Sequence, residues 1–152
     1  MTDLNRILLV EDSAPDVELT MAALQEHKLA NEVVVARDGA EALDFLFRRG
    51  AHAGRSPENP VVILLDLKMP RVDGFEVLQQ IKSDPRLKLI PVVILTSSRE
   101  ERDLRRAYSL GVNGYAVKSI DFVDYRERLH TLIKYWASVN EQPIAAASLD
   151  NR

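Results

Sequence analysis

Residues 61–70 read VVILLDLKMP, in which five consecutive apolar residues lead directly into one carboxylate, Asp66. A short apolar run of this kind is typical of a buried strand. Pro70 and then Asp73–Gly74 follow the carboxylate and indicate a loop. An aspartate at the end of one strand is usually a turn residue, so the ends of the other strands decide whether Asp66 has a further role.

Three other predicted strands also lead into polar side chains. Two acids follow the first strand, hydroxyl groups end the fourth, and a lysine ends the fifth. In a parallel sheet these carboxyl ends share one edge, which is where open α/β sheets bind ligands. We therefore expect five side chains to share one crevice: Glu11, Asp12, Asp66, Thr96 and Lys118.

Apolar runs alternate along the chain with segments of helical period. This alternation is typical of βα units packed around a parallel sheet. It predicts an α/β fold with a five-stranded parallel sheet, doubly wound as (βα)5, in the flavodoxin-like class. The strands are expected near 6–11, 32–36, 61–66, 91–96 and 114–118.

The predicted helices have capping signals and apolar stripes. Four of them begin at residues that cap helices or form turns: Ser13, Asp38–Gly39, Asp73–Gly74 and Asp121. The other helix is more polar and is marked by Leu104, Ala107, Tyr108 and Gly111. In the fifth helix we expect one inward stripe: Phe122, Leu129, Leu132, Ile133 and Trp136. Residues 50–60 contain two Gly and two Pro without periodicity, which predicts a long loop.

Composition indicates one compact domain. The 152 residues are 46% hydrophobic and carry a net charge of −3, so we expect no general attraction to nucleic acid or to a membrane surface. There is no cysteine, which excludes disulfides and thiolate metal sites. No export signal and no apolar run of about 20 residues is present, so a cytoplasmic location is expected. The domain should span 1–139, with 140–152 a disordered tail too short to form an output domain.

The predicted crevice has the chemistry of a phosphate-accepting site. Crowded carboxylates cannot all ionise cheaply unless a cation joins them, and hard oxygen ligands favour Mg²⁺. A metal beside Asp66 attracts a phosphoryl group, whose oxygens Lys118 can neutralise and Thr96 can hydrogen-bond. Each side chain alone has an ordinary explanation, such as a helix cap or a solvated charge. Their occurrence together at four strand ends favours phosphoryl transfer to a carboxylate.

These residues resemble the receiver domain of two-component response regulators over about residues 5–138. The resemblance rests on three groups: Glu11–Asp12; Asp66 with Met69–Pro70 and Asp73–Gly74; and Thr96 with Tyr115 three residues before Lys118. It implies that Asp66 accepts a phosphoryl group from a phosphohistidine of a sensor histidine kinase. Such a protein signals through protein contacts, and its own chemistry is limited to self-phosphorylation and self-dephosphorylation.

The resemblance also implies a role for each site residue. Asp12, Asp66 and the backbone carbonyl of Lys68 would hold Mg²⁺, with Glu11 helping through a water molecule. Thr96 and Lys118 would contact the phosphoryl oxygens. Tyr115 would change rotamer when Thr96 is drawn inward, and so would belong to a switch.

Two positions depart from the usual receiver pattern. Ser119 follows Lys118 where receivers usually have a proline joined by a cis bond, and a cis bond before a residue other than proline costs about 2.5–4 kcal/mol. The sequence leaves cis and trans open. Lys68 occupies a position that is often small and polar, and with Ser98 it flanks the path of the attacking water. These two residues are therefore expected to tune the lifetime of the phosphate.

Weaker features of the sequence indicate a subgroup of response regulators and a surface for dimerisation. The Lys118–Ser119 pair, the 50–60 loop and Tyr135–Trp136 are similar to stand-alone regulators that partner bacterial phytochrome kinases. The resemblance also implies a homodimer through the fourth helix, fifth strand and fifth helix. The mixed charges of 99–106 suit reciprocal salt bridges, although they also suit a solvated helix.

Three alternatives remain open from the sequence. A phosphatase of the haloacid dehalogenase type also uses a strand-end Asp, but it has a second Asp two residues on, where this chain has Lys68. A flavin-binding module would need a phosphate cradle after the first strand, where Glu11–Asp12 would repel phosphate. The third alternative is a receiver-like scaffold that binds partners without phosphorylation. Only measurement distinguishes it from a working receiver.

Overall fold

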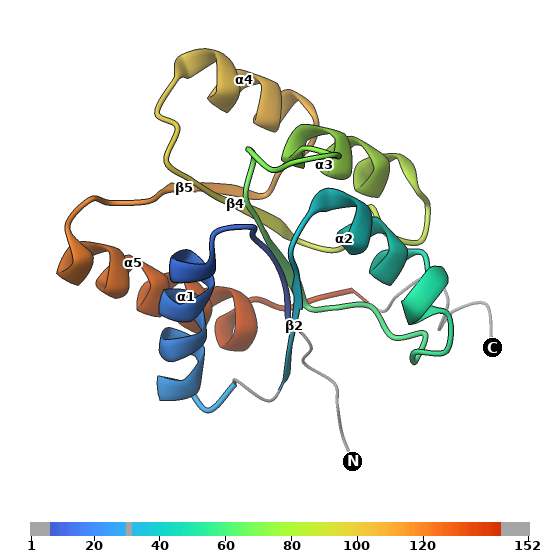
Figure 1. The fold of residues 1–152 in the computed structure, drawn as a ribbon, viewed down its shortest axis with the longest axis horizontal. Coiled ribbons are helices and arrows are strands. Elements are labelled where there is room, and N and C mark those ends of the chain that lie inside the picture. Colours follow the sequence, from blue (N-terminus) through green and yellow to red (C-terminus); the bar gives the residue numbers. More distant parts are fainter. Residues whose placement is uncertain (1–6, 30–31, 144–152) are drawn as a thin grey trace.

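The computed structural model describes residues 7–29 and 32–143 and contains one parallel sheet. The strand order is β2-β1-β3-β4-β5 (Figure 1). The strands are β1 (Ile7–Val10), β2 (Val33–Ala36), β3 (Val62–Leu65), β4 (Val92–Thr96) and β5 (Gly114–Val117). This architecture confirms the predicted doubly wound α/β fold.

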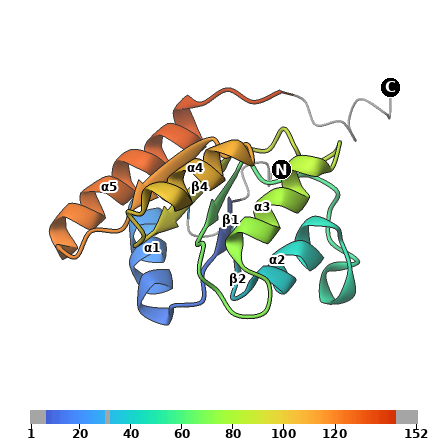
Figure 2. The ribbon, with the colours of Figure 1, turned by 90° about the horizontal axis from the view of Figure 1, so that it is seen from above.

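Five helices cover the two faces of the sheet. They are α1 (Ala14–Glu26), α2 (Gly39–Leu46), α3 (Gly74–Ser83), α4 (Glu101–Ser109) and α5 (Phe122–Lys134). Helices α1 and α5 lie together on one face, and α2, α3 and α4 lie on the other (Figures 1 and 2). Helix α5 continues into a π-helical turn, Tyr135–Val139.

The central strands are buried on both faces, which is why they read as uninterrupted apolar runs. Side chains of a strand alternate between faces, so successive residues enter different cores. In β1, Leu8 packs with the core under α2, α3 and α4, whereas Leu9 packs with the core under α1 and α5. In β3, Ile63 and Leu64 divide in the same way.

The predicted helix starts are confirmed by their caps. The side chains of Ser13, Asp38, Asp73 and Asp121 each accept a backbone N–H from the first turn of the helix that follows. Helix α4 has no side-chain cap at Glu100. Capping therefore fixes where four of these helices leave the edge of the sheet that carries the predicted site.

One predicted inward position is wrong, because Phe122 is 58% exposed. The inward stripe of α5 instead begins at Tyr125, one helical turn before Leu129, and both of these side chains are buried. Phe122 lies in the first turn, before the part of the helix that packs on the sheet. In α4 only Ala107 is buried, so this helix packs against the domain mainly through one small side chain.

The 50–60 segment is a loop with more order than its composition predicts. It opens with a 3₁₀ turn at Gly50–His52. The Arg55 guanidinium then donates to the carbonyls of Phe45 (2.6 Å) and Leu46 (3.4 Å) and lies 4.0 Å from the Phe45 ring centroid. Arg55 therefore caps the C-terminal end of α2 from outside the helix.

Two further expectations concern the C-terminal tail and membrane-spanning helices. The predicted disordered tail lies largely in residues 144–152, outside the described part of the structure. None of the helices in the described ranges is long and apolar enough to cross a membrane.

Candidate functional site

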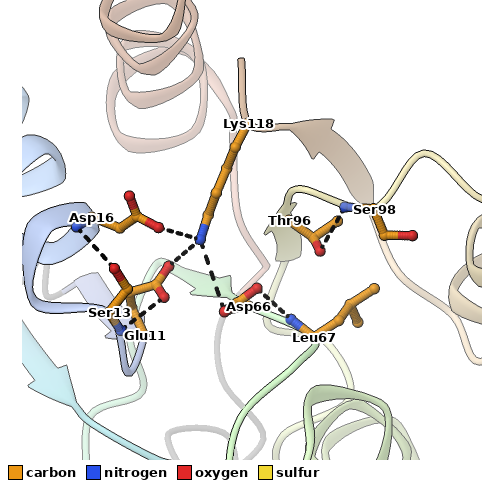
Figure 3. A network of polar contacts seen from close by, with 8 residues as sticks. All are labelled: Glu11, Ser13, Asp16, Asp66, Leu67, Thr96, Ser98 and Lys118. Carbon is orange, nitrogen blue, oxygen red and sulfur yellow. Dashed lines mark hydrogen bonds and ion pairs between the residues drawn. The ribbon is translucent and has the colours of Figure 1, made fainter. Parts of the chain in front are cut away.

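The expected side chains meet at the carboxyl edge of the sheet (Figure 3). Glu11, Asp12 and Asp66 each place one carboxylate oxygen within 4.8 Å of the others. Glu11 and Asp66 are buried, whereas Asp12 is exposed. The parallel topology brings these three acids together from β1 and β3, as the sequence predicts.

Lys118, directly after β5, reaches across the sheet edge to the acids. Its Nζ donates to Glu11 Oε1 at 2.7 Å and to Asp16 Oδ2 at 2.8 Å. The nearest carboxylate oxygen of Asp66, Oδ2, is 3.8 Å from Nζ, which is beyond a normal hydrogen bond. Lys118 is thus bonded to the β1 and α1 side of the crevice.

Asp16 is a site residue that the sequence analysis missed. It lies in the first turn of α1, where an acidic residue is ordinarily explained by the positive end of the helix dipole. The available signal is the Ser13 cap, because it fixes the start of α1 directly after Glu11–Asp12. A first-turn acid in this position belongs to the same edge of the sheet as the other acids.

Burial and pairing shift the pKa values of these groups. Burial raises the pKa of Glu11 to about 7, although the hydrogen bond from Lys118 opposes the rise. Burial also raises the pKa of Asp66, against the charge of Lys118. Burial alone would lower the pKa of Lys118, but hydrogen bonds to Asp16 and Glu11 raise it overall. Burial in the crevice therefore disfavours the charged forms of Glu11 and Asp66, and the Lys118 ammonium offsets only part of that cost.

The loop after β3 holds Asp66 by close backbone contacts. Asp66 Oδ1 accepts the N–H of Leu67 at 2.9 Å, and the N–H of Gly74 donates to the Leu67 carbonyl at 2.8 Å. A Cβ atom at Gly74 would lie 2.3 Å from the backbone oxygen of Asp66. Glycine is therefore required at this position for the start of α3 to approach the site.

Thr96, Ser98 and Tyr115 form a second group beside Asp66. Thr96 Oγ1 accepts the N–H of Ser98 at 3.2 Å, and the Tyr115 hydroxyl donates to the Ser98 carbonyl at 3.1 Å. The Ser98 hydroxyl donates to Asp103 Oδ2 at 2.6 Å. Ser98 thus links the end of β4 to α4 and to Tyr115 on β5.

Lys68 borders an open cleft rather than the buried cluster. Its side chain is exposed, and among the described residues it has no hydrogen bond or ion pair. The cleft has a volume of about 450 Å³, and its lining includes Asp12, Pro70 and Arg106. The peptide bond between Lys118 and Ser119, which the sequence left open, is trans, since no bond in the described ranges is cis.

The acidic cluster fits a divalent metal ion. Three carboxylates supply hard oxygen ligands, and exposed Asp12 leaves a route of entry. Burial raises the pKa values of Glu11 and Asp66, so ionising both acids is costly even with Lys118 beside them. A bound cation would supply further positive charge.

Comparison with known proteins identifies the family. Residues 7–130 match the family model of the response regulator receiver domain. This match spans most of the 152-residue chain, so the chain belongs to the response regulator receiver domain family. The predicted resemblance is confirmed, and membership decides against the phosphatase and flavin-binding alternatives.

Phytochrome response regulators are among the most similar relatives. Response regulator Rcp1 of Synechocystis sp. is 41% identical over 139 residues, covering 91% of this chain and 93% of Rcp1. The crystal structure of the phosphorylated cyanobacterial phytochrome response regulator RcpA matches with a TM-score of 0.86 at 41% identity, covering 92% of this chain and 99% of that one. The bacteriophytochrome response regulator AtBRR matches with a TM-score of 0.71 at 54% identity, covering 91% and 99%.

One solved structure bears on the metal. The Mn(2+)-bound form of Rcp1 matches with a TM-score of 0.84 at 40% identity, covering 92% of this chain and 99% of that one. Relatives therefore include a phosphorylated form and a metal-bound form. This chain is a receiver domain of the phosphoacceptor signalling class.

Proposed function

We propose that Asp66 accepts a phosphoryl group from a phosphohistidine of a sensor histidine kinase. The observation that carries this proposal is the position of Asp66, a buried carboxylate with Glu11 and Asp12 on one side and Lys118 within 3.8 Å. A carboxylate oxygen of Asp66 attacks phosphorus and forms a new P–O bond. The P–N bond to the kinase histidine breaks, and its electron pair returns to the imidazole nitrogen.

The surrounding residues divide into ligands and phosphoryl contacts. Asp12, Asp66 and the backbone carbonyl of Lys68 would hold Mg²⁺, with Glu11 acting through water. When bound, Mg²⁺ neutralises charge on the phosphoryl oxygens. Lys118 supplies an ammonium and Thr96 a hydroxyl for the remaining oxygens. Proximity of Lys118 to Asp66 supports its part in this arrangement.

Thr96 and Tyr115 form the proposed switch. Both are bonded to the backbone of Ser98, Thr96 through its N–H and Tyr115 through its carbonyl. When Thr96 turns toward a phosphoryl oxygen, it loses the Ser98 bond, and Tyr115 changes rotamer with the loop. Lys68 and Ser98 flank the water that later hydrolyses the acyl phosphate, and so tune its lifetime.

The proposed partner is a bacterial phytochrome histidine kinase. This proposal is supported by similar proteins of known structure that are phytochrome or bacteriophytochrome response regulators. We place the receiver domain within 1–139 and the protein in the cytoplasm. The net charge of −3 supports recognition of proteins rather than of nucleic acid or membrane.

A homodimer through α4, β5 and α5 is part of the proposal. β5 is an edge strand, and a groove of about 630 Å³ lies between it and α5. Tyr115, Arg128, Tyr135 and Trp136 line this groove, and Tyr and Arg are enriched at interfaces. Arg105 pairs with Glu101 within α4, and Arg102 pairs with Glu100 directly before it. The apolar groove therefore supports the dimer better than reciprocal salt bridges do.

Two experiments test the proposal. With Mg²⁺ and acetyl phosphate, intact mass should show one added phosphoryl group on wild type and none on Asp66→Asn. Sedimentation at micromolar concentration should show a dimer that tightens with the phosphodonor. Tyr135→Ser should weaken this dimer, whereas Leu89→Ser, a control of similar exposure (51% against 46%) on the loop after α3, should not. A monomer in both states would remove the dimer.

A further inference from the structure

Asp16 bonds to Lys118 but has no part in the phosphoryl transfer proposed above. Its Oδ2 accepts from Lys118 Nζ at 2.8 Å, about as closely as Glu11 does at 2.7 Å. Asp16 is held in place by α1, because the Ser13 cap accepts its N–H and Pro15 lies beside it in the first turn of the helix. Asp16 and Asp66 lie on opposite sides of the ammonium (Figure 3).

The Lys118 ammonium can donate only a limited number of hydrogen bonds. A lysine ammonium has three protons, and Glu11 and Asp16 each take one. At 3.8 Å from Asp66 Oδ2, Lys118 lies outside hydrogen-bonding distance of that carboxylate. The third proton is free for a phosphoryl oxygen on Asp66, and because Asp16 lies on the opposite side of the ammonium (Figure 3), any movement of Lys118 toward that oxygen lengthens the bond to Asp16.

Burial decides which of the two existing bonds can be lost. The Glu11 side chain is 4% exposed, so an unpaired charge there would be costly. The Asp16 side chain is 27% exposed, so water can replace the ammonium when it leaves. The bond to Asp16 is therefore the one that can open and close reversibly.

We propose that Asp16 competes with phosphorylated Asp66 for the Lys118 ammonium, and as a positioning residue favours the unphosphorylated state. This inference rests on the proposed phosphorylation of Asp66. It predicts that removing the Asp16 carboxylate leaves Lys118 freer to bind the phosphoryl group. The phosphorylated form of such a variant should be more stable relative to the unphosphorylated form.

The test uses beryllofluoride, which binds a carboxylate oxygen and occupies the position of a phosphoryl group. Its dissociation constant is measured by ¹⁹F NMR at saturating Mg²⁺ for wild type, Asp16→Asn, Asp16→Ser and Asp66→Asn. Glu18→Gln is the matched control, because it removes one negative charge from the exposed side of α1 without touching Lys118. Asp16→Asn and Asp16→Ser should bind about threefold to tenfold more tightly than wild type, and Glu18→Gln within twofold of it.

Each result separates the competition from the phosphorylation itself. If wild type does not bind beryllofluoride, or if Asp66→Asn binds it equally, the proposed function is wrong and the competition falls with it. If wild type binds and Asp66→Asn does not, but both Asp16 variants bind no more tightly than wild type, phosphorylation stands and the competition is wrong. Equal tightening by Glu18→Gln would also overturn it, because general charge would then explain the effect.

Discussion

The Nζ atom of Lys118 lies 3.8 Å from Oδ2 of Asp66, so the two groups form an ion pair that is too long to be a hydrogen bond (Figure 3). The lysine is instead satisfied by Glu11 and Asp16, and the aspartate by the N–H of Leu67. A phosphoryl oxygen on Asp66 would therefore lie near the Lys118 ammonium, whose hydrogen bonds to Glu11 and Asp16 can rearrange. This arrangement suits a site that must accept a group and later lose it.

Stability should depend on pH through Glu11. Its folded pKa of about 7 is above the ordinary value of 4.5, so between these values the folded protein binds more protons than the unfolded chain. Metal-free stability should therefore fall as pH rises from about 4.5 to about 7, and the raised pKa of Asp66 adds in the same direction. Urea unfolding across this range measures the slope. Glu11→Gln should flatten it and Glu18→Gln should not; an unchanged slope in Glu11→Gln would contradict the assignment.

Gly74→Ala should destabilise the protein by about 1–3 kcal/mol, because the new Cβ overlaps backbone atoms that cannot move independently. The new Cβ would lie 2.3 Å from the backbone oxygen of Asp66 and 2.7 Å from the Cα of Leu67. The matched control is Gly54→Ala, where a Cβ meets nothing within 4 Å. Thermal melting of both variants tests this, and equal melting temperatures would show that the close approach is not needed.

Tyr125→Phe should stabilise the protein by about 1 kcal/mol, since a buried hydroxyl without a partner costs its lost hydration. The Tyr125 hydroxyl makes no hydrogen bond of normal geometry within the described ranges, although the nearby Thr20 side chain slightly opposes the rise of its pKa to about 12 that burial causes. Tyr115→Phe removes a hydroxyl that does have a partner and should be destabilising instead. Denaturant unfolding compares the two variants. A loss of stability in Tyr125→Phe would mean that its hydroxyl is bonded in solution.

Much of this site could be predicted because parallel strands deliver their carboxyl ends to one edge. Asp66, Glu11 and Lys118 come directly after strands, so the topology alone brings them together. Asp16 was not predictable in the same way, because it reaches the site from within a helix, at a position where acids are common for other reasons. Its contact depends on side-chain direction, which strand order does not determine.

The errors in α5 and in the 50–60 loop have related causes. Helical spacing alone could not tell whether Phe122 or Tyr125 begins the inward stripe, since that depends on where the helix first meets the sheet. Part of the order of the loop comes from Arg55, which bonds backbone carbonyls about ten residues earlier in the sequence, and from Asn59, which donates to the carbonyl of Arg86. A composition rich in Gly and Pro gives no sign of such a contact.

Lys68→Asn should shorten the lifetime of the phosphorylated state by roughly threefold or more, because a long cation beside the path of the attacking water obstructs it or pairs with the phosphoryl charge. The exposed, unpaired position of Lys68 within the described chain leaves it free to do so. Decay is followed by intact mass after the phosphodonor is removed. Lys88→Asn, an exposed lysine after α3, should decay as wild type does. Equal or slower decay in Lys68→Asn would remove this role.

Direct location of the phosphoryl group is the sharpest test of whether Asp66 is the phosphoacceptor. After incubation with Mg²⁺ and acetyl phosphate, borohydride reduces an aspartyl phosphate to homoserine, which peptide mass spectrometry can place in the sequence. We expect homoserine at position 66 in wild type, none without Mg²⁺, and none anywhere in Asp66→Asn. Homoserine at position 12 or 16 in wild type, or modification that persists unchanged in Asp66→Asn, would contradict it.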